Sequence, residues 1–403
     1  MKTALQDIIN ARKILRSVVR KTPLEYSYTF SRLTDCKLYL KEESFQKTGA
    51  FKVRGAYVKI NSLTNQQKKH GVIAASAGNH GQGVAYASSM QKIPCTIVMP
   101  VNASPAKVSA TRSYGADVVL HGILYDQSWD KAQEIAKQQG RTVIHAFDDP
   151  HVIAGNGTIG LEVLEDLPDI DAIYLPIGGG GLAAGVAIAV KSKKPNVKVI
   201  GVQSKAFPAM KMSIEKGKIV EASIGSTIAD GISVKHPGEL TYKILNKYID
   251  DVVTIGDNEI VKTMFLLMER AKLVVEPAGA VGLAYLMSNG NPFKGKKVVT
   301  VLTGGNVDMY LLGQIVSKGL LETGRMLKIS IQLVDRPGEL KNVVDSVVAS
   351  RVNIVEVLHD RLSQDVAVGK AKVTLSLETE DDEHRRRMMK FLKRNHIDFE
   401  VVS

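Results

Sequence analysis

Short apolar runs alternate with helical segments through most of the chain. Runs such as Cys95–Met99, Ala172–Pro176 and Lys297–Leu302 are largely apolar on both faces rather than alternately polar and apolar. Segments with apolar residues at helical spacing separate these runs. Because strands buried on both faces occur in parallel sheets that helices cover, the pattern predicts an α/β fold with parallel sheets.

The alternation defines a series of elements before residue 303. The expected strands are residues 37–43, 71–75, 95–99, 117–121, 142–145, 172–176, 198–203 and 297–302. The expected helices lie within residues 1–20 and at 51–63, 81–90, 106–114, 125–138, 155–166, 183–192, 257–272 and 277–287. Parallel sheets of this kind bind ligands at the carboxyl ends of their strands, so functional residues are expected in the turns that follow the strands.

The pattern changes near residues 321–325. Beyond them the expected strands are 327–334, 353–360, 366–378 and 399–402, and the expected helices are 339–350 and 382–395. The order strand, helix, strand, strand, helix, strand is typical of a ferredoxin-like sandwich. We therefore expect a domain at residues 1–322, with a small subdomain at about residues 45–150 inserted in a larger one, and a second domain at residues 323–403.

Composition narrows the class of protein. The 403 residues carry a formal net charge of +12, but the basic residues are scattered and aromatic residues make up only 5%, which argues against a nucleic-acid-binding protein. The two cysteines, Cys36 and Cys95, form neither a zinc motif nor a disulfide framework and fit a cytoplasmic location. The uncharged residues 173–190 contain Pro176 and four glycines, so we expect a strand, a loop and a buried helix there rather than a membrane span.

The segment Ala50-Phe51-Lys52-Val53-Arg54-Gly55-Ala56 places a lysine near the start of an expected helix. Partial burial and the positive end of a helix both lower the pKa of a lysine and favour the free amine that covalent chemistry requires. By itself this segment also fits an ordinary surface lysine on an amphipathic helix.

Three further loops lie between an expected strand and an expected helix or turn. Ser76-Ala77-Gly78-Asn79-His80-Gly81 and Gly178-Gly179-Gly180-Gly181-Leu182 present successive backbone N–H groups at a helix start, which makes an anion site. Neither loop has the spacing of a dinucleotide or nucleoside triphosphate motif. Thr303-Gly304-Gly305-Asn306 follows the strand 297–302. Taken singly, each loop also fits a helix cap, a flexible run or a tight turn.

Together and in this order, the four segments resemble those of the threonine/serine dehydratase family, pyridoxal-phosphate enzymes of fold type II, over about residues 5–320. The resemblance implies that Lys52 binds the cofactor covalently and removes the α-proton of the substrate, with Phe51 beside it. It implies that Asn79 contacts the 3′-oxygen of the cofactor ring and that Thr303 contacts the pyridine nitrogen. The implied phosphate cradle is Gly178, Gly179, Gly180, Gly181 and Leu182. The implied substrate contacts are Ser76, Ala77, Gly78 and His80.

The implied activity is that of a threonine ammonia-lyase, which converts L-threonine to 2-oxobutanoate and ammonia, and L-serine to pyruvate. The alternatives on the same scaffold are a serine racemase, a β-replacement synthase and a non-catalytic amino-acid-sensing protein. Ala77 stands where racemases of the family usually carry a second serine, which disfavours racemisation. Gln203 stands where some members carry a metal-binding carboxylate, so no metal is expected.

The turn Asp335-Arg336-Pro337-Gly338-Glu339-Leu340 resembles the first turn of an ACT domain, over about the last 77 residues. The resemblance implies that Gly338 and Asn353 contact an amino-acid or nucleotide effector; a dimerisation module with an empty pocket is the alternative. A single such unit favours a medium-length enzyme over the long, isoleucine-inhibited biosynthetic form, although a biosynthetic and a catabolic role both stay open. We expect a homodimer or homotetramer in which these units pair.

Overall fold

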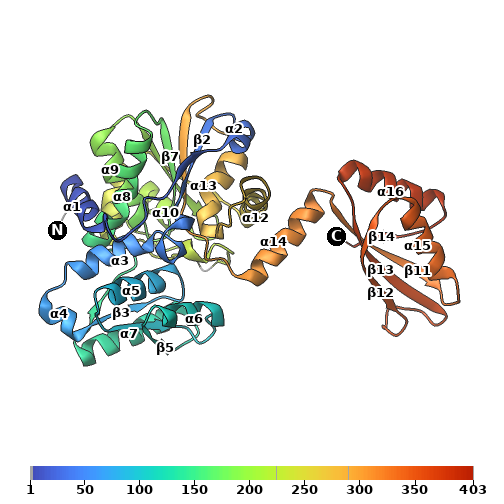
Figure 1. Ribbon diagram of the computed structural model, residues 1–403, viewed down its shortest axis with the longest axis horizontal. Helices are drawn as coiled ribbons and strands as arrows, with labels where there is room; N and C mark the ends of the chain where they lie inside the picture. The colour runs from blue at the N-terminus through green and yellow to red at the C-terminus, as the bar shows by residue number, and fades with distance from the viewer. Residues whose placement is uncertain (1–2, 224, 289, 403) are drawn as a thin grey trace. The chain divides into compact units, whose positions relative to one another are not determined.

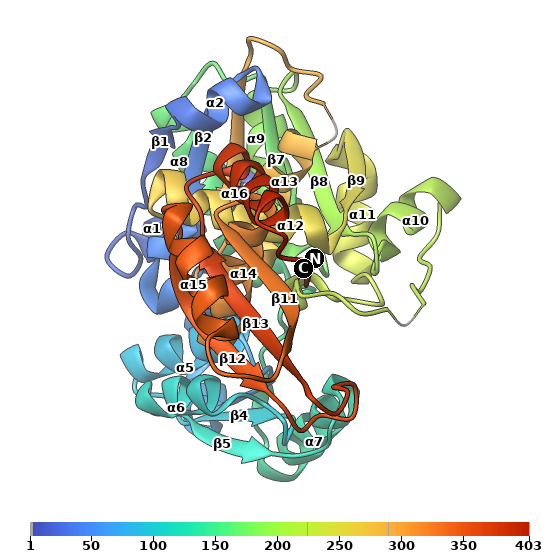
Figure 2. The ribbon, with the colours of Figure 1, turned by 90° about the vertical axis from the view of Figure 1, so that its right-hand side faces the viewer.

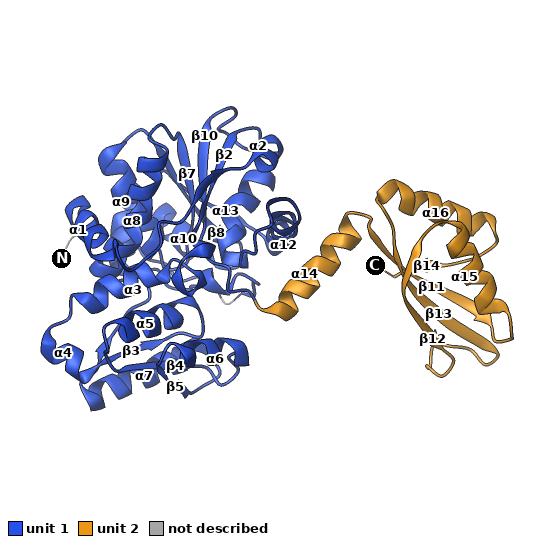
Figure 3. Cartoon of the chain, viewed as in Figure 1, with its two compact units in different colours: residues 1–307 blue, residues 308–403 orange. Residues whose placement is uncertain are grey.

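The computed structural model describes residues 3–223, 225–288 and 290–402. The chain divides into two compact units, residues 1–307 and residues 308–403 (Figure 3). We expected a boundary after residue 322, and the structure divides the chain before helix α14 (Met309–Glu322). This helix contacts strand β11 (Met326–Val334), which belongs to the second unit.

The larger sheet of the first unit has the strand order β1-β2-β10-β7-β8-β9. Strand β1 runs antiparallel to β2, and the other neighbours are parallel. The strands are β1 (Leu24–Tyr26), β2 (Lys37–Glu42), β10 (Lys297–Leu302), β7 (Ala172–Pro176), β8 (Lys198–Ser204) and β9 (Asp251–Ile255). The central strands are buried on both faces, which explains why their apolar residues do not alternate with polar ones.

Helices cover both faces of this sheet (Figures 1 and 2). One group comprises α1 (Leu5–Leu15), α8 (Pro150–Asp166), α9 (Gly181–Lys193), α10 (Ala209–Lys216) and α11 (Glu239–Tyr248). The other comprises α2 (Tyr28–Thr34), α12 (Asp257–Leu266) and α13 (Pro277–Ser288), and α13 lies directly on β7, β8 and β10. A π-helical turn, Leu267–Ala271, extends α12.

The smaller sheet is wholly parallel, with the order β5-β4-β3-β6. Its strands are β3 (Val72–Ala75), β4 (Cys95–Met99), β5 (Asp117–Leu120) and β6 (Thr142–Val143). Its helices are α3 (Lys52–Asn61), α4 (Asn65–His70), α5 (Asn79–Met90), α6 (Pro105–Ser113) and α7 (Tyr125–Gln139). Along β3, Val72 and Ala74 enter one core cluster, while Ile73 and Ala75 enter another with residues of α7.

The second unit contains a four-stranded antiparallel sheet with the order β12-β13-β11-β14. Besides α14 and β11, its elements are α15 (Glu339–Ala349), β12 (Asn353–Asp360), β13 (Lys370–Glu378), α16 (Asp382–Arg394) and β14 (Glu400–Val401). Alternate residues of β11, Leu327, Ile329 and Ile331, are buried in its core. This order is that of a ferredoxin-like sandwich, and the expected fold class is confirmed for both units.

Several local boundaries differ from those expected. Helix α8 begins at Pro150 rather than residue 155, because the carboxylate of Asp149 accepts hydrogen bonds from the first free N–H groups of the helix. Strand β13 begins at Lys370 rather than residue 366. The sequence did not predict β1, β9, α2, α4, α10, α11 and α14. Across the described residues, no helix is both long and apolar enough to cross a bilayer.

Candidate active site

The lysine-bearing loop is fastened to the loop that follows β10. Ala50 forms an isolated bridge with Gly304, and the N–H of Phe51 donates to the Thr303 carbonyl at 3.1 Å. The N–H of Gly305 donates to the Gly49 carbonyl at 2.9 Å. Gly49 has a φ of +70°, a left-handed conformation that favours glycine. Two segments about 250 residues apart in the sequence therefore meet at the start of α3.

Lys52 is the first residue of α3, and its side chain is half-buried. It donates to the Ala146 carbonyl at 3.1 Å and lies 5.1 Å from the centre of the Phe51 ring. Burial lowers the pKa of Lys52 to about 8, although the field of Glu276 opposes that shift. A substantial fraction of this lysine is thus a free amine at mildly alkaline pH, as a nucleophile or proton acceptor requires.

The Ser76–Gly78 loop joins β3 to α5 and leaves the helix start open. No side chain caps α5, and a Cβ atom built at Gly78 would meet nothing within 4 Å. The Ser76 hydroxyl accepts a hydrogen bond from the Gly78 N–H at 3.2 Å, and Ala77 is half-buried. Asn79 begins α5 and donates to Glu276 while accepting from Asn306.

His80 follows Asn79 in α5, and its side chain is packed inside the first unit. Its ring is buried, Nε2 lies 2.8 Å from the Ile144 carbonyl, and burial together with the nearby Lys52 lowers its pKa to about 3. The imidazole is therefore neutral and engaged with the Ile144 carbonyl, and the substrate contact expected of His80 stays a prediction.

The four glycines connect β7 to α9, and close packing explains why three of them lack a side chain. A Cβ atom at Gly179 would lie 2.3 Å from the ring of Phe147, and one at Gly181 would lie 2.9 Å from the Cα of the same residue. Gly180 has a φ of +94° and precedes α9 without a capping side chain. The first N–H groups of α9, including that of the buried Leu182, thus remain available to an anion.

The four loops meet in one region of the first unit. Lys52 bonds to Ala146, and the adjacent Phe147 lies against the glycine run. Thr303, 3% exposed at the end of β10, is tied to the lysine loop through Phe51. The sequence did not single out Ala146 and Phe147, although their position just after the expected strand 142–145 is a signal that could have found them.

Gln203 lies near the end of β8, at the position where some members of the resembled family carry a metal-binding carboxylate. Its Oε1 accepts a hydrogen bond from the Lys211 N–H at 2.9 Å. Within the ranges that the structure describes, no three His, Cys, Asp or Glu side chains are grouped as metal ligands.

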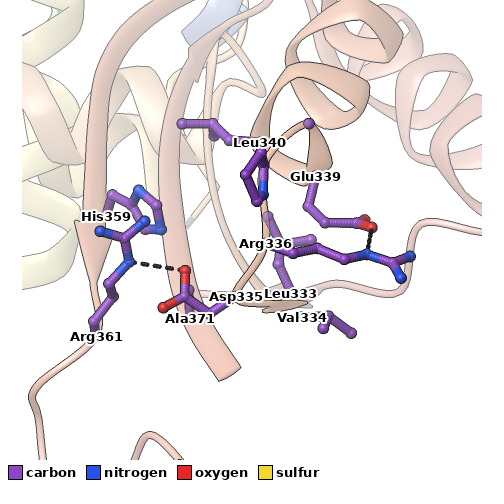
Figure 4. A pocket seen from close by; sticks show the side chains of 11 residues that line it. Leu333, Val334, Asp335, Arg336, Glu339, Leu340, His359, Arg361 and Ala371 are labelled. Atoms are coloured by element: carbon purple, nitrogen blue, oxygen red, sulfur yellow. Dashed lines mark hydrogen bonds and ion pairs between the residues drawn. The ribbon is translucent and has the colours of Figure 1, made fainter. Parts of the chain in front are cut away.

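A separate cavity of about 360 Å³ lies within the second unit, around the first turn of α15 (Figure 4). Arg361 pairs with Asp335 at 2.9 Å, and Arg336 pairs with Glu339 at 2.7 Å. The remaining lining residues are Leu333, Val334, Pro337, Gly338, Leu340, His359 and Ala371. Asn353 does not line this cavity; its side chain donates to Glu378 at 3.1 Å.

A lysine at a helix start, two glycine-containing loops at uncapped helix starts and a hydroxyl at a strand end are the arrangement expected of an enzyme that holds a phosphorylated cofactor next to a reactive amine. Residues 15–304 match the family described as pyridoxal-phosphate dependent enzymes. The chain belongs to this family, and the expected family is confirmed.

Relatives of known name extend the comparison. The L-threonine ammonia-lyase of Thermotoga maritima is 46% identical over 380 residues, which cover 94% of each chain. The catabolic L-threonine dehydratase TdcB of Escherichia coli is 44% identical over 314 residues, which cover 77% of this chain and 95% of its own. The solved structure of maize serine racemase superimposes with a TM-score of 0.75 at 34% identity, over 80% of this chain and 99% of that one.

Proposed function

We propose that this protein is an L-threonine ammonia-lyase that uses pyridoxal 5′-phosphate to convert L-threonine to 2-oxobutanoate and ammonia, and L-serine to pyruvate and ammonia. The observation that carries the proposal is the junction at Lys52, where a half-buried amine of lowered pKa meets the Thr303 loop and the Ala146–Phe147 segment. The 46% identity to a relative of this name over nearly the whole chain supports the choice of substrate.

The residues present fit the cofactor. The N–H groups of Gly178 to Leu182, at an uncapped helix start, suit its phosphate, and glycines leave room where a Cβ would strike Phe147. The Thr303 hydroxyl suits the ring nitrogen, and Asn79 suits the ring oxygen. Pyridoxal phosphate, when bound, withdraws electrons from the α-carbon of the substrate. A hydroxyl partner leaves the ring nitrogen less positive than a carboxylate would, which favours elimination.

The chain's own groups then act on the substrate. The open start of α5 binds the carboxylate through the N–H groups near Ser76, Ala77 and Gly78. Lys52, as a free amine, takes the α-proton at Nζ. Departure of the β-hydroxyl as water leaves an enamine, whose hydrolysis returns one water and yields the 2-oxo acid and ammonia. Ala77 lacks a hydroxyl with which to protonate the opposite face, so elimination is favoured over racemisation.

The cavity of the second unit is proposed as an effector site. The uncapped N-terminus of α15, with Gly338 at a φ of +98°, suits a carboxylate, and Asp335 suits an ammonium group. Leu333, Leu340 and Ala371 add apolar lining. The apolar lining favours an apolar amino acid. A nucleotide stays the alternative, because Arg336, Arg361 and His359 also line the cavity and the two arginines neutralise its acids. Isoleucine is the first probe.

We also propose that the enzyme is a cytoplasmic homodimer or homotetramer. Both cysteines are free and buried, as in a reducing compartment. Strand β12 is an edge of its sheet and exposes Val355, Val357 and Leu358, which a second copy would cover. Size-exclusion chromatography with light scattering tests the assembly; a strict monomer at all concentrations would contradict it.

The activity itself is tested by following 2-oxo acid formation from L-threonine, L-serine and D-serine. We expect turnover of the two L-amino acids, and at least a 10³-fold loss in Lys52→Ala. Lys69→Ala, an exposed lysine of α4, is the matched control and should keep full activity. Equal activity of Lys52→Ala and the wild type would refute the proposal, and interconversion of L- and D-serine as the main reaction would favour the racemase.

A further inference from the structure

Glu276 is a buried acid beside the candidate active site to which the proposed function gives no part. It immediately precedes α13, and its side chain is 6% exposed. Both of its carboxyl oxygens accept from Nδ2 of Asn79 at 2.8 Å. Burial raises the pKa of this carboxyl to about 7. A buried carboxyl group whose side-chain partner is a neutral amide destabilises the folded protein, and groups of this kind are typical of functional sites.

Asn306 holds the other end of the Asn79 carboxamide. Its Nδ2 donates to Oδ1 of Asn79 at 2.8 Å and to the backbone carbonyl of Thr48 at 2.7 Å. Because a backbone carbonyl can only accept, it fixes the orientation of Asn306, which in turn fixes that of Asn79. An acceptor on one side and a donor on the other thus allow a single orientation of Asn79, with its NH₂ group toward Glu276.

Two glycines make room for this chain of side chains. A Cβ atom at Gly304 would lie 2.6 Å from Oε1 of Glu276, and one at Gly49 would lie 2.5 Å from Oδ1 of Asn306. Both contacts are shorter than packed atoms tolerate, so any larger residue would displace the acid or the amide. The hydrogen bonds among Glu276, Asn79 and Asn306 therefore require glycine at both positions.

The charged groups around Glu276 come from three other elements. Lys52 at the start of α3 and Lys107 in α6 are the cations, and Asp230, in the turn Asp230–Ile232, is the anion. Lys107 and Asp230 pair with each other at 2.9 Å, so their fields largely cancel at Glu276. Among these charged residues, Lys52 has no paired anion comparable to the Lys107–Asp230 pair. The field of Glu276 raises the pKa of Lys52, whereas burial lowers it.

We propose that Glu276 is a positioning residue: it accepts one N–H of Asn79, which leaves the second N–H of the same NH₂ group for the ring oxygen of the cofactor, and its carboxylate supplies a negative field at the amine of Lys52. The inference rests on the proposed function, because it assumes that the cofactor lies between Asn79 and Lys52. Glu276 thus has two separable tasks. It orients the Asn79 carboxamide together with Asn306, and it supplies the negative charge that acts on Lys52.

The charge is tested in Glu276→Gln, which keeps the shape of the side chain. In the cofactor-loaded enzyme, the pH midpoint of the visible band of the lysine-bound cofactor should fall by about 1 unit, because a carboxylate no longer favours the protonated form. We expect kcat to fall about tenfold with KM within about twofold of the wild type. Glu42→Gln, another buried acid whose pKa is raised to about 7, is the matched control and should leave the midpoint unchanged.

The orientation is tested in Asn306→Ala, which frees the carbonyl end of Asn79 but keeps Glu276. The dissociation constant of the cofactor should rise about tenfold, the amount that one lost hydrogen bond explains, while the pH midpoint stays within about 0.2 unit. If Glu276→Gln does not fold, Glu276→Asp replaces it; that variant retains the charge and should weaken cofactor binding without moving the midpoint.

The outcomes separate this inference from the proposed function. A wild-type protein that binds no pyridoxal phosphate would remove the basis for both. A wild-type protein with the visible band, together with an unchanged midpoint in Glu276→Gln, would overturn the charge assignment alone. Unchanged cofactor affinity in Asn306→Ala would overturn the orientation assignment.

Discussion

Burial of Lys52 prepares the amine for reaction before any ligand arrives. Its pKa is lowered to about 8, whereas an exposed lysine titrates near 10.5. Because only the free amine attacks an aldehyde, the rate at which the cofactor-free protein takes up pyridoxal phosphate should rise with pH and level off above pH 8. Stopped-flow absorbance across pH 6–10.5 measures this rate. A rate that continues to climb through pH 10 would indicate an ordinary, solvated lysine.

The glycine run owes its composition to Phe147. In Gly179→Ala the added Cβ atom would overlap the phenyl ring, so the loop must move from the start of α9. We expect the dissociation constant of pyridoxal phosphate to rise at least about tenfold, with little change in melting temperature. Gly313→Ala is the matched control, because a Cβ there meets nothing within 4 Å. Fluorescence titration of both variants provides the comparison, and equal affinities would contradict the steric account.

At the scale of residues, the sequence predicted the functional residues that stand in short contiguous motifs. Lys52 and the four glycines stand in short segments that are ambiguous one at a time, and the order of the four segments along the chain is what identified them. Glu276 and Asn306 give no local signal, because their partner Asn79 lies 197 and 227 residues away, respectively, and only the fold brings them together. The motif around His80 likewise does not reveal that its ring lies against the Ile144 carbonyl, which is 64 residues away in the sequence.

A buried cluster of charges fixes α3 to its neighbours. Arg54, fully buried, pairs with Glu43 at 2.7 Å and with Glu162 of α8 at 2.6 Å, and Lys41 of β2 also pairs with Glu162 at 2.7 Å. Burial alone would raise the pKa of Glu162, but Arg54 and Lys41 lower it overall. Two cations and two anions thus balance within one buried space.

Removing one member of this cluster leaves charges unpaired. Arg54→Met should lower the free energy of unfolding by about 3–5 kcal/mol, because two buried carboxylates lose their shared partner. Glu239→Gln breaks an exposed pair of 3.7 Å on α11 and should change stability by less than about 0.5 kcal/mol. Urea denaturation of both variants tests the contrast. A loss below about 1 kcal/mol for Arg54→Met would show that the cluster contributes little.

At the scale of elements, the sequence predicted strands that are buried on both faces and helices with one apolar face. Strand β1, three residues long, is too short to show a period. Helix α14 is apolar over much of its surface and contains Gly313 and Gly319, which lower helix propensity, so its pattern gave no clear signal. The start of α8 was missed although Asp149-Pro150, an acid at the cap position followed by proline at the first helical position, is a sequence signal for it.

The two units divide catalysis from regulation in our proposal. The catalytic groups all lie within residues 1–307, and the E. coli relative aligns with only 77% of this chain. A chain that ends at residue 307 should therefore keep its kcat/KM for L-threonine within about threefold and lose any response to isoleucine. Steady-state assays with and without isoleucine measure both. Loss of activity in a folded, truncated protein would show that the second unit supports catalysis directly.

The central claim is that Lys52 carries pyridoxal phosphate and uses it on L-threonine. The most direct measurement is the visible spectrum of the purified protein before and after L-threonine is added. The account predicts a band at about 410–420 nm that changes on addition of threonine while 2-oxobutanoate accumulates, and that is absent from Lys52→Ala. A colourless protein that pyridoxal phosphate does not reconstitute would contradict the claim, and so would a band that persists in Lys52→Ala.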